Sequence, residues 1–178
     1  MIRASLMILA AACALQAQTN PLIASQKAAY DRLKTNLVKA AEKMPEEAYS
    51  FKPTPEIRAF GQIFGHVANA QYGTCAAVKG VPNPNQGTNL EQKTTKAEFT
   101  KALADSFAFC DEAFSSLTDA NVTEMVKQGQ NEVTRAGALA GLIAHGNELY
   151  GTAAVYLRLK GIVPPTTERQ MQRGRGGN

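Results

Sequence analysis

The sequence has no tryptophan and only two histidines in 178 residues. Runs of valine, isoleucine and threonine, which are typical of strands, are scarce, and this leaves little material for a β fold. Alanine, leucine, lysine, glutamate and glutamine predominate instead, so the composition predicts an all-α protein. The phosphate-binding loop, the dinucleotide-binding fingerprint, the serine-hydrolase elbow and the HExxH motif are all absent. Charged residues make up 19% of the chain and form no basic stripe, which argues against a nucleic-acid partner.

The one long apolar run lies at the N-terminus. The stretch "MIRASLMILAAACALQAQ" places Arg3 before apolar residues, followed by small residues and a polar start, as in a secretory signal peptide. The run is too short for a membrane span. We therefore expect a signal peptide over residues 1–17, cleaved after Ala17 or Ala14, and a periplasmic or secreted protein. Because "AAAC" ends at Cys13, anchoring as a lipoprotein is the alternative.

Four later stretches repeat apolar residues at spacings of three and four, which predicts a four-helix bundle over residues 20–165. The helices are expected at about 22–44, 55–78, 95–117 and 134–160.

Capping residues support these helix boundaries. Thr54 before Pro55 is the expected start of the second helix. Thr95 and Glu98 form a capping box at the start of the third. Thr134 is the expected cap of the fourth helix, which then ends at Gly161.

The connectors predict how the helices are arranged. The stretch "GVPNPNQGTNLEQKT" is too long for a simple turn, so we expect a crossover that makes the second and third helices parallel. The polar stretch "TDANVTEMVKQGQNEVT" is a second connector, with room for a short helical turn at 122–126. Residues 166–178 are rich in glycine, arginine and glutamine and predict a disordered basic tail.

Without the signal peptide, two cysteines remain, Cys75 and Cys110. Each lies late in its helix, so parallel helices would place both at the same end of the bundle. An even number of cysteines in an oxidising compartment is compatible with one disulfide. Two buried free thiols are the alternative.

The two histidines, His66 and His145, lie in the middle of the second and fourth helices. A lone histidine in a helix is more often packed than ligating, but bundle cores build metal sites from facing helices. Zinc needs about three protein ligands, and Glu148, one turn after His145, could supply the third. Such a set would suit zinc, nickel or iron. Asn69 and Asn147 are weaker candidates as ligands.

The stretches "MPEEAYSFKPTPEIRAFGQIFGHVANAQY" and "AHGNELYGTAAVYLRLKGIVPP" resemble the DinB/YfiT-like family, above all a secreted or periplasmic subset of it. The resemblance implies a four-helix bundle with a long crossover, and homodimers are common in such bundles. It also implies a divalent metal held by three histidines. His66 and His145 match two of these positions, and Leu149 occupies the third. The family includes thiol-dependent transferases and isomerases.

Two functional hypotheses follow. The first is a bundle protein with a degraded or weak divalent-metal site, or with no metal, that keeps a pocket for a small-molecule ligand. The second is a metal-dependent thiol S-transferase or isomerase that uses His66, His145 and Glu148. Leu149 places an apolar group where a ligand should be, so the first hypothesis is favoured. The sequence identifies no substrate.

Overall fold

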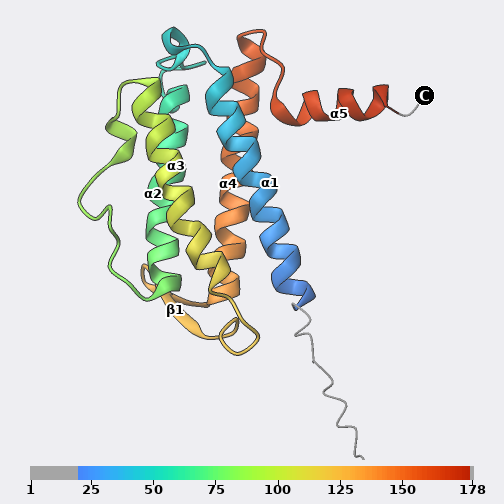
Figure 1. The fold of residues 1–178 in the computed structure, drawn as a ribbon. Helices are drawn as coiled ribbons and strands as arrows, with labels where there is room; N and C mark the ends of the chain where they lie inside the picture. The colour runs from blue at the N-terminus through green and yellow to red at the C-terminus, as the bar shows by residue number, and fades with distance from the viewer. Residues whose placement is uncertain (1–19, 177–178) are drawn as a thin grey trace, which may run out of the picture.

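The computed structural model describes residues 20–176, and the expected signal peptide and Cys13 lie outside this range. The fold is the predicted all-α bundle (Figure 1). Its four long helices are α1 (Pro21–Lys43), α2 (Phe60–Lys79), α3 (Lys96–Ser115) and α4 (Arg135–Leu159). The smaller elements are the 3-10 turns η1 (Glu46–Ala48) and η2 (Leu90–Gln92), the strands β1 (Met125–Gln128) and β2 (Asn131–Thr134), and α5 (Pro165–Arg175).

The helices run in two directions. In Figure 1, α1 and α4 run from the bottom to the top, whereas α2 and α3 run from the top to the bottom. The chain between α2 and α3 returns along the outside of the bundle, so the predicted crossover is confirmed. Between the helices lies an apolar core whose fully buried side chains include Tyr30, Tyr156, Phe60, Phe64, Phe107 and Leu37.

A disulfide joins the two parallel helices. Cys75 of α2 and Cys110 of α3 are bonded, with 5.3 Å between their Cα atoms, and both residues are fully buried. This separation falls within the range that a disulfide requires. The bond depends on the crossover, because only parallel helices bring these two late positions to the same end.

The ends of α1, α3 and α4 lie within two residues of the predicted ends, and Thr95, Glu98 and Thr134 cap as expected. The predicted start of α2 was wrong. Thr54 does not cap this helix, which begins at Phe60.

The connector before α2 explains its late start. The amides of Phe60 and Gly61 donate to the carbonyl oxygens of Phe51 and Tyr49, at 3.0 and 2.9 Å. Gln62 accepts a hydrogen bond from the amide of Ala59, at 2.9 Å. These partners satisfy amides that a helix start leaves free, so the helix needs no cap at Thr54.

The second connector contains hydrogen-bonded turns at 119–123 and then a β-hairpin, so the short helical turn expected around 122–126 lies earlier and residues 125–126 belong to a strand. β1 and β2 pair antiparallel, with Val126 opposite Val133. Gly129 has a φ of +63°, which suits the first position of a two-residue hairpin turn. The glycine and the two valines favour the hairpin, which the sequence analysis did not predict.

The C-terminal segment differs from the expected disordered tail, because Pro165–Arg175 forms α5. Specific contacts hold this helix. Arg169 donates to the buried Asn36 at 2.8 Å, and Lys43 pairs with Glu168 at 3.2 Å. In Figure 1, α5 leaves the bundle at a steep angle to the four long helices. Composition alone could not reveal it, since its anchors lie far away along the chain.

Across residues 20–176, none of the helices combines the length and the hydropathy needed to cross a membrane.

Candidate functional site

The structure brings the two histidines together. His66 of α2 and His145 of α4 have ring centroids 5.1 Å apart, with the rings edge to face at 68°. Their side chains are partly open to solvent, at 27% and 35% exposure. The pairing predicted from facing helices is therefore present, at a position that a ligand can reach.

Glu91 is the residue that the sequence analysis missed. One carboxylate oxygen lies 2.7 Å from Nδ1 of His66, and the other accepts a hydrogen bond from Nε of Arg58 at 2.9 Å. Burial alone would raise the pKa of Glu91, but the hydrogen bonds from Arg58 and His66 outweigh it and lower this pKa below its usual value. Glu91 is therefore a carboxylate that fixes the orientation of His66. The one signal in the sequence was the unusual length of the crossover, which is typical of functional loops.

Two residues of α2 place Glu91 by holding the crossover. A Cβ atom added at Gly65 would lie 2.5 Å from the carbonyl oxygen of Leu90, so only glycine lets η2 lie this close to the helix. One turn later, Asn69 accepts a hydrogen bond from the amide of Leu90 at 3.1 Å and donates to the side chain of Asn89 at 2.9 Å. Asn69, considered as a weak ligand from the sequence, instead fastens the crossover beside His66.

Glu148 lies beside His145, on the solvent side of the ring. Its carboxylate is 3.8 Å from Nδ1 of His145, and its side chain is 77% exposed. Burial is the main effect that lowers the pKa of His145, and the charge of His66 lowers it further. The carboxylate of Glu148 raises this pKa but does not outweigh burial, so the pKa lies below its usual value. Asn147 donates to the carbonyl oxygen of Ile143 in its own helix, at 3.0 Å, so its amide is engaged away from the histidines.

The donor set can be compared with what a metal requires. In residues 20–176, no group of three or more His, Cys, Asp and Glu side chains is arranged to hold a metal ion. Nδ1 of each histidine faces a carboxylate, which leaves one ring nitrogen of each for a ligand. Leu149, at the third position, is buried, with 7% exposure. Within the described residues, the histidine pair is therefore present without two or more further side chains arranged around it as a metal site.

An open pocket of about 500 Å³ lies beside Glu91 and Glu148, the two carboxylates that face the histidines, although neither histidine lines it. Its lining combines apolar residues with carboxylates and one arginine, and includes Glu56, Ile57, Arg58, Ile63, Glu91, Glu148, Leu149, Thr152 and Tyr156. Glu91 lies 2.7 Å from Nδ1 of His66 and Glu148 lies 3.8 Å from Nδ1 of His145, so these two carboxylates stand between the pocket and the histidine pair.

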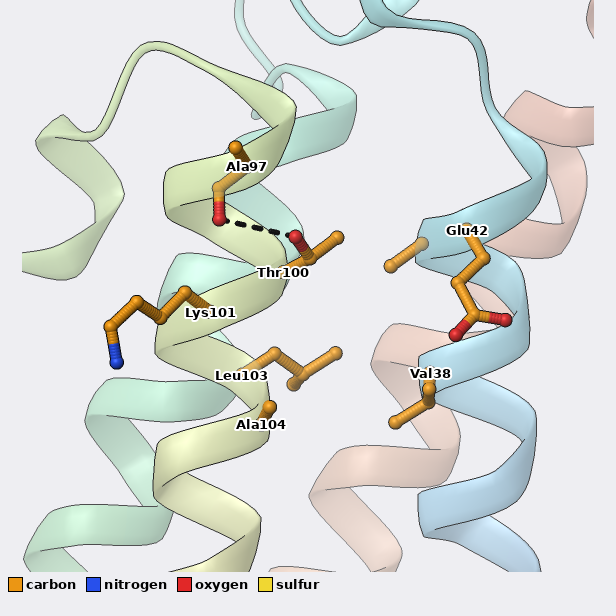
Figure 2. Close-up of a pocket in the computed structure, with 8 residues that line it drawn as sticks. Val38, Glu42, Ala97, Thr100, Lys101, Leu103 and Ala104 are labelled. Atoms are coloured by element: carbon orange, nitrogen blue, oxygen red, sulfur yellow. Dashed lines mark hydrogen bonds between the residues drawn. The ribbon is translucent and has the colours of Figure 1, made fainter.

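A second groove, of about 380 Å³, lies between α1 and α3 (Figure 2). Figure 2 shows Val38 and Glu42 on one side of it and Thr100, Leu103 and Ala104 on the other. No histidine lines this groove, and the two histidines lie on α2 and α4. The groove is therefore separate from the candidate site.

Comparison with solved structures identifies the same fold in bacterial proteins. A DinB-like protein from Bacillus cereus ATCC 10987 superposes with a TM-score of 0.68 at 17% identity, over 80% of this chain and 95% of that one. A DinB-like protein from Bacillus subtilis gives 0.59 at 18% identity, over 80% and 92%. A conserved protein from Enterococcus faecalis gives 0.63 at 16% identity, over 76% and 95%. At these identities the likeness concerns the fold alone.

No curated protein is significantly similar to the chain. The family model of the DinB superfamily matches residues 29–153, which span α1 to α4 and include both histidines and Leu149. The match covers more than half of the sequence and spans the four long helices of the bundle. The chain belongs to the DinB superfamily.

Proposed function

We propose that this chain is an exported DinB-type bundle protein that binds divalent metal weakly through His66 and His145. The observation that carries the proposal is the pair of facing histidines with Leu149 at the third ligand position. A buried isobutyl group cannot coordinate a metal, so water would have to complete the coordination of any bound ion. Sites with so few protein ligands hold zinc, nickel or iron loosely.

Two features support residual metal binding. Imidazole is a good ligand for these metals, and the carboxylate of Glu91 on Nδ1 of His66 is the outer partner that metal-binding histidines commonly have. His66 and His145 would therefore hold the ion, and Glu91 would orient His66. When bound, the metal would supply a Lewis acid that polarises an oxygen of a neighbouring ligand.

The disulfide supports the proposal of export. Disulfides persist in oxidising compartments and are rare in the cytosol. The bond between Cys75 and Cys110 suits the periplasmic or secreted location that the N-terminal pattern predicts.

The alternative, a metal-dependent thiol S-transferase or isomerase with Glu148 as third ligand, has less support. Glu148 lies 3.8 Å from Nδ1 of His145 and its side chain is mostly exposed, so a metal would have to immobilise a solvated side chain to gain this ligand.

Metal affinity of the chelator-stripped protein tests the proposal. Zinc or nickel is titrated against a chromophoric chelator of known affinity, in the unchanged protein and in His66→Ala and His145→Ala. We expect micromolar or weaker binding to the unchanged protein and none to either variant. Stoichiometric nanomolar binding that is lost in His66→Ala would overturn the proposal, because it would require a complete site.

A further inference from the structure

A small cavity lies inside the bundle, on the core side of His145. A volume of about 10 Å³ within it is open to the centre of a water molecule, which is room for one water. Residues of α1, α2 and α4 line the cavity, and all of them except His145 are buried. His145 is the lining residue that also reaches solvent, with a side chain that is 35% exposed.

Gln71 brings an unsatisfied polar group to this cavity. The residue is 2% exposed, and its Oε1 atom is buried without a hydrogen-bond partner within residues 20–176. A buried amide oxygen without a partner costs free energy, so such groups are usually completed by a protein donor or by an ordered water. The torsion at the end of a glutamine side chain is broad, which lets the amide turn towards a molecule in the cavity.

His145 is the second polar group that the cavity offers. One carboxylate oxygen of Glu148 lies 3.8 Å from its Nδ1, which is beyond hydrogen-bond distance. The hydroxyl of Tyr30, which also lines the cavity, already has two oxygen partners on α3, at 3.0 and 3.1 Å. The other side chains of the lining are apolar, namely Leu33, Val67 and Leu142. A polar molecule in the cavity would therefore join Gln71 to His145.

We propose that the cavity binds one water molecule that hydrogen-bonds to both Gln71 and His145, and that Gln71 thereby positions the ring of His145. Two polar partners fall within the range of two to four that buried waters have. A water can bridge them, because it donates to the amide oxygen and can either donate to or accept from a ring nitrogen. Gln71 then does for His145, through a water, what Glu91 does for His66 by direct contact. The water holds the ring less firmly than a carboxylate, since it can itself turn.

A count of buried waters in the metal-free protein is the first test. Relaxation dispersion of solvent ¹⁷O and ²H counts the water molecules that stay bound for longer than the protein tumbles. Gln71→Met nearly keeps the size of the side chain and removes its amide, and cavities with apolar linings stay dry. We expect this variant to hold one long-lived water fewer than the unchanged protein. An equal number in the two proteins would overturn the proposal.

The ring of His145 is the second test, because loss of packing alone would not select one tautomer. The ¹⁵N shifts of the ring nitrogens, recorded at pH 8, report which nitrogen carries the proton. In Gln71→Met the shifts of His145 should move towards the average of the two tautomers. Those of His66 should stay the same, since Glu91 still holds that ring. Unchanged His145 shifts in a variant that has lost the water would overturn the positioning role.

Thr74→Val is the matched control. Thr74 is a buried polar residue one turn further along α2, it does not line the cavity, and its hydroxyl accepts a hydrogen bond from Gln128 at 2.8 Å. Its replacement should lower stability, as loss of a buried hydrogen bond does, and leave the water count and the His145 shifts unchanged. Equal effects of the two substitutions on the water count or on the shifts would overturn the proposal.

The unchanged protein provides a measurement that does not depend on whether Gln71→Met folds. Cross-relaxation between water and the methyl protons that line the cavity should show a bound water, and its absence would overturn the proposal. All these measurements use protein without metal, so their outcome is separate from that of the metal titration. Failure to bind metal would leave this proposal standing, and a dry cavity would leave the two-histidine proposal standing.

Discussion

At the scale of single residues, the chain Arg58–Glu91–His66 defines the site more than the histidines alone do. His66 has its Nδ1 bound by a carboxylate that is itself fixed by a guanidinium, whereas His145 has only a longer contact with an exposed glutamate. The two imidazoles are therefore not equivalent. We expect His66 to be held in one tautomer and His145 to be held less firmly.

Glu91→Ala tests this difference. Removing the carboxylate should free the ring of His66 and weaken zinc or nickel binding by about tenfold or more, as loss of an outer partner does. The measurement is metal affinity together with the ¹⁵N shifts of the histidine ring nitrogens in the metal-free protein. Only the His66 signals should change, and Glu47→Ala should change neither quantity. Unaltered His66 shifts would contradict the role given to Glu91.

Glu98 gives a prediction for pH. Hydrogen bonds from the amides of Thr94 and Thr95 lower its pKa to about 2. Because this pKa is depressed in the folded state, the stabilisation is present above the usual value of about 4.5 and is lost as the pH falls towards 2. Glu98→Gln should therefore be less stable than the unchanged protein at pH 7, with a difference that shrinks between pH 5 and pH 2. Urea unfolding across that range measures it, and a difference independent of pH would contradict the assignment.

At the scale of elements, the crossover is part of the site rather than a spacer. It returns the chain so that α2 and α3 are parallel, and it carries Glu91 to the edge of α2. Gly65 lies so close to the backbone of Leu90 that any side chain at position 65 would displace Leu90 and, with it, Glu91.

Gly65→Ala tests that dependence. The new Cβ would meet the backbone of Leu90, so η2 must move, and we expect a destabilisation of about 1–3 kcal/mol. The ¹⁵N shifts of His66 should change in the same sense as in Glu91→Ala. Gly73→Ala in the same helix is the control, because nothing lies within 4 Å of its Cβ position. That change should stabilise the protein by about 0.5–1 kcal/mol.

The disulfide links the same two elements. It closes a loop over a sequence separation of 35 residues that contains the whole crossover. In the chain-entropy account, replacing both cysteines by alanine should lower the free energy of unfolding by about 3–4 kcal/mol. Equilibrium unfolding in urea measures this loss, and reduction of the unchanged protein provides a second estimate. A loss below about 1 kcal/mol would show that packing of α2 on α3 suffices without the bond.

At the scale of the whole molecule, the features predicted correctly from the sequence are those that depend on local apolar periodicity and on capping residues. The four helices, the capping box at Thr95 and the stop at Gly161 follow from neighbouring residues, and all are present. The misplaced start of α2 and the unpredicted α5 depend instead on partners far along the chain, such as the carbonyl oxygen of Tyr49 and the side chain of Asn36.

The residues of the site divide in the same way, into those predicted from nearby sequence and those placed by contacts far along the chain. Helical spacing placed His66 and His145 on facing helices, and the family pattern pointed to Leu149. Glu91 was out of reach, because its contact with His66 depends on how the crossover lies on Gly65 and Asn69. No local pattern in the sequence encodes that arrangement.

The metal affinity of Leu149→His tests the central claim most directly. If the bundle has lost one ligand and kept the rest of the site, this single substitution should tighten zinc or nickel binding by about 100-fold or more over the unchanged protein. The gain should disappear when His66→Ala is added. Tight binding by the unchanged protein, or no gain from the new histidine while the fold is intact, would contradict a site that lacks only its third ligand.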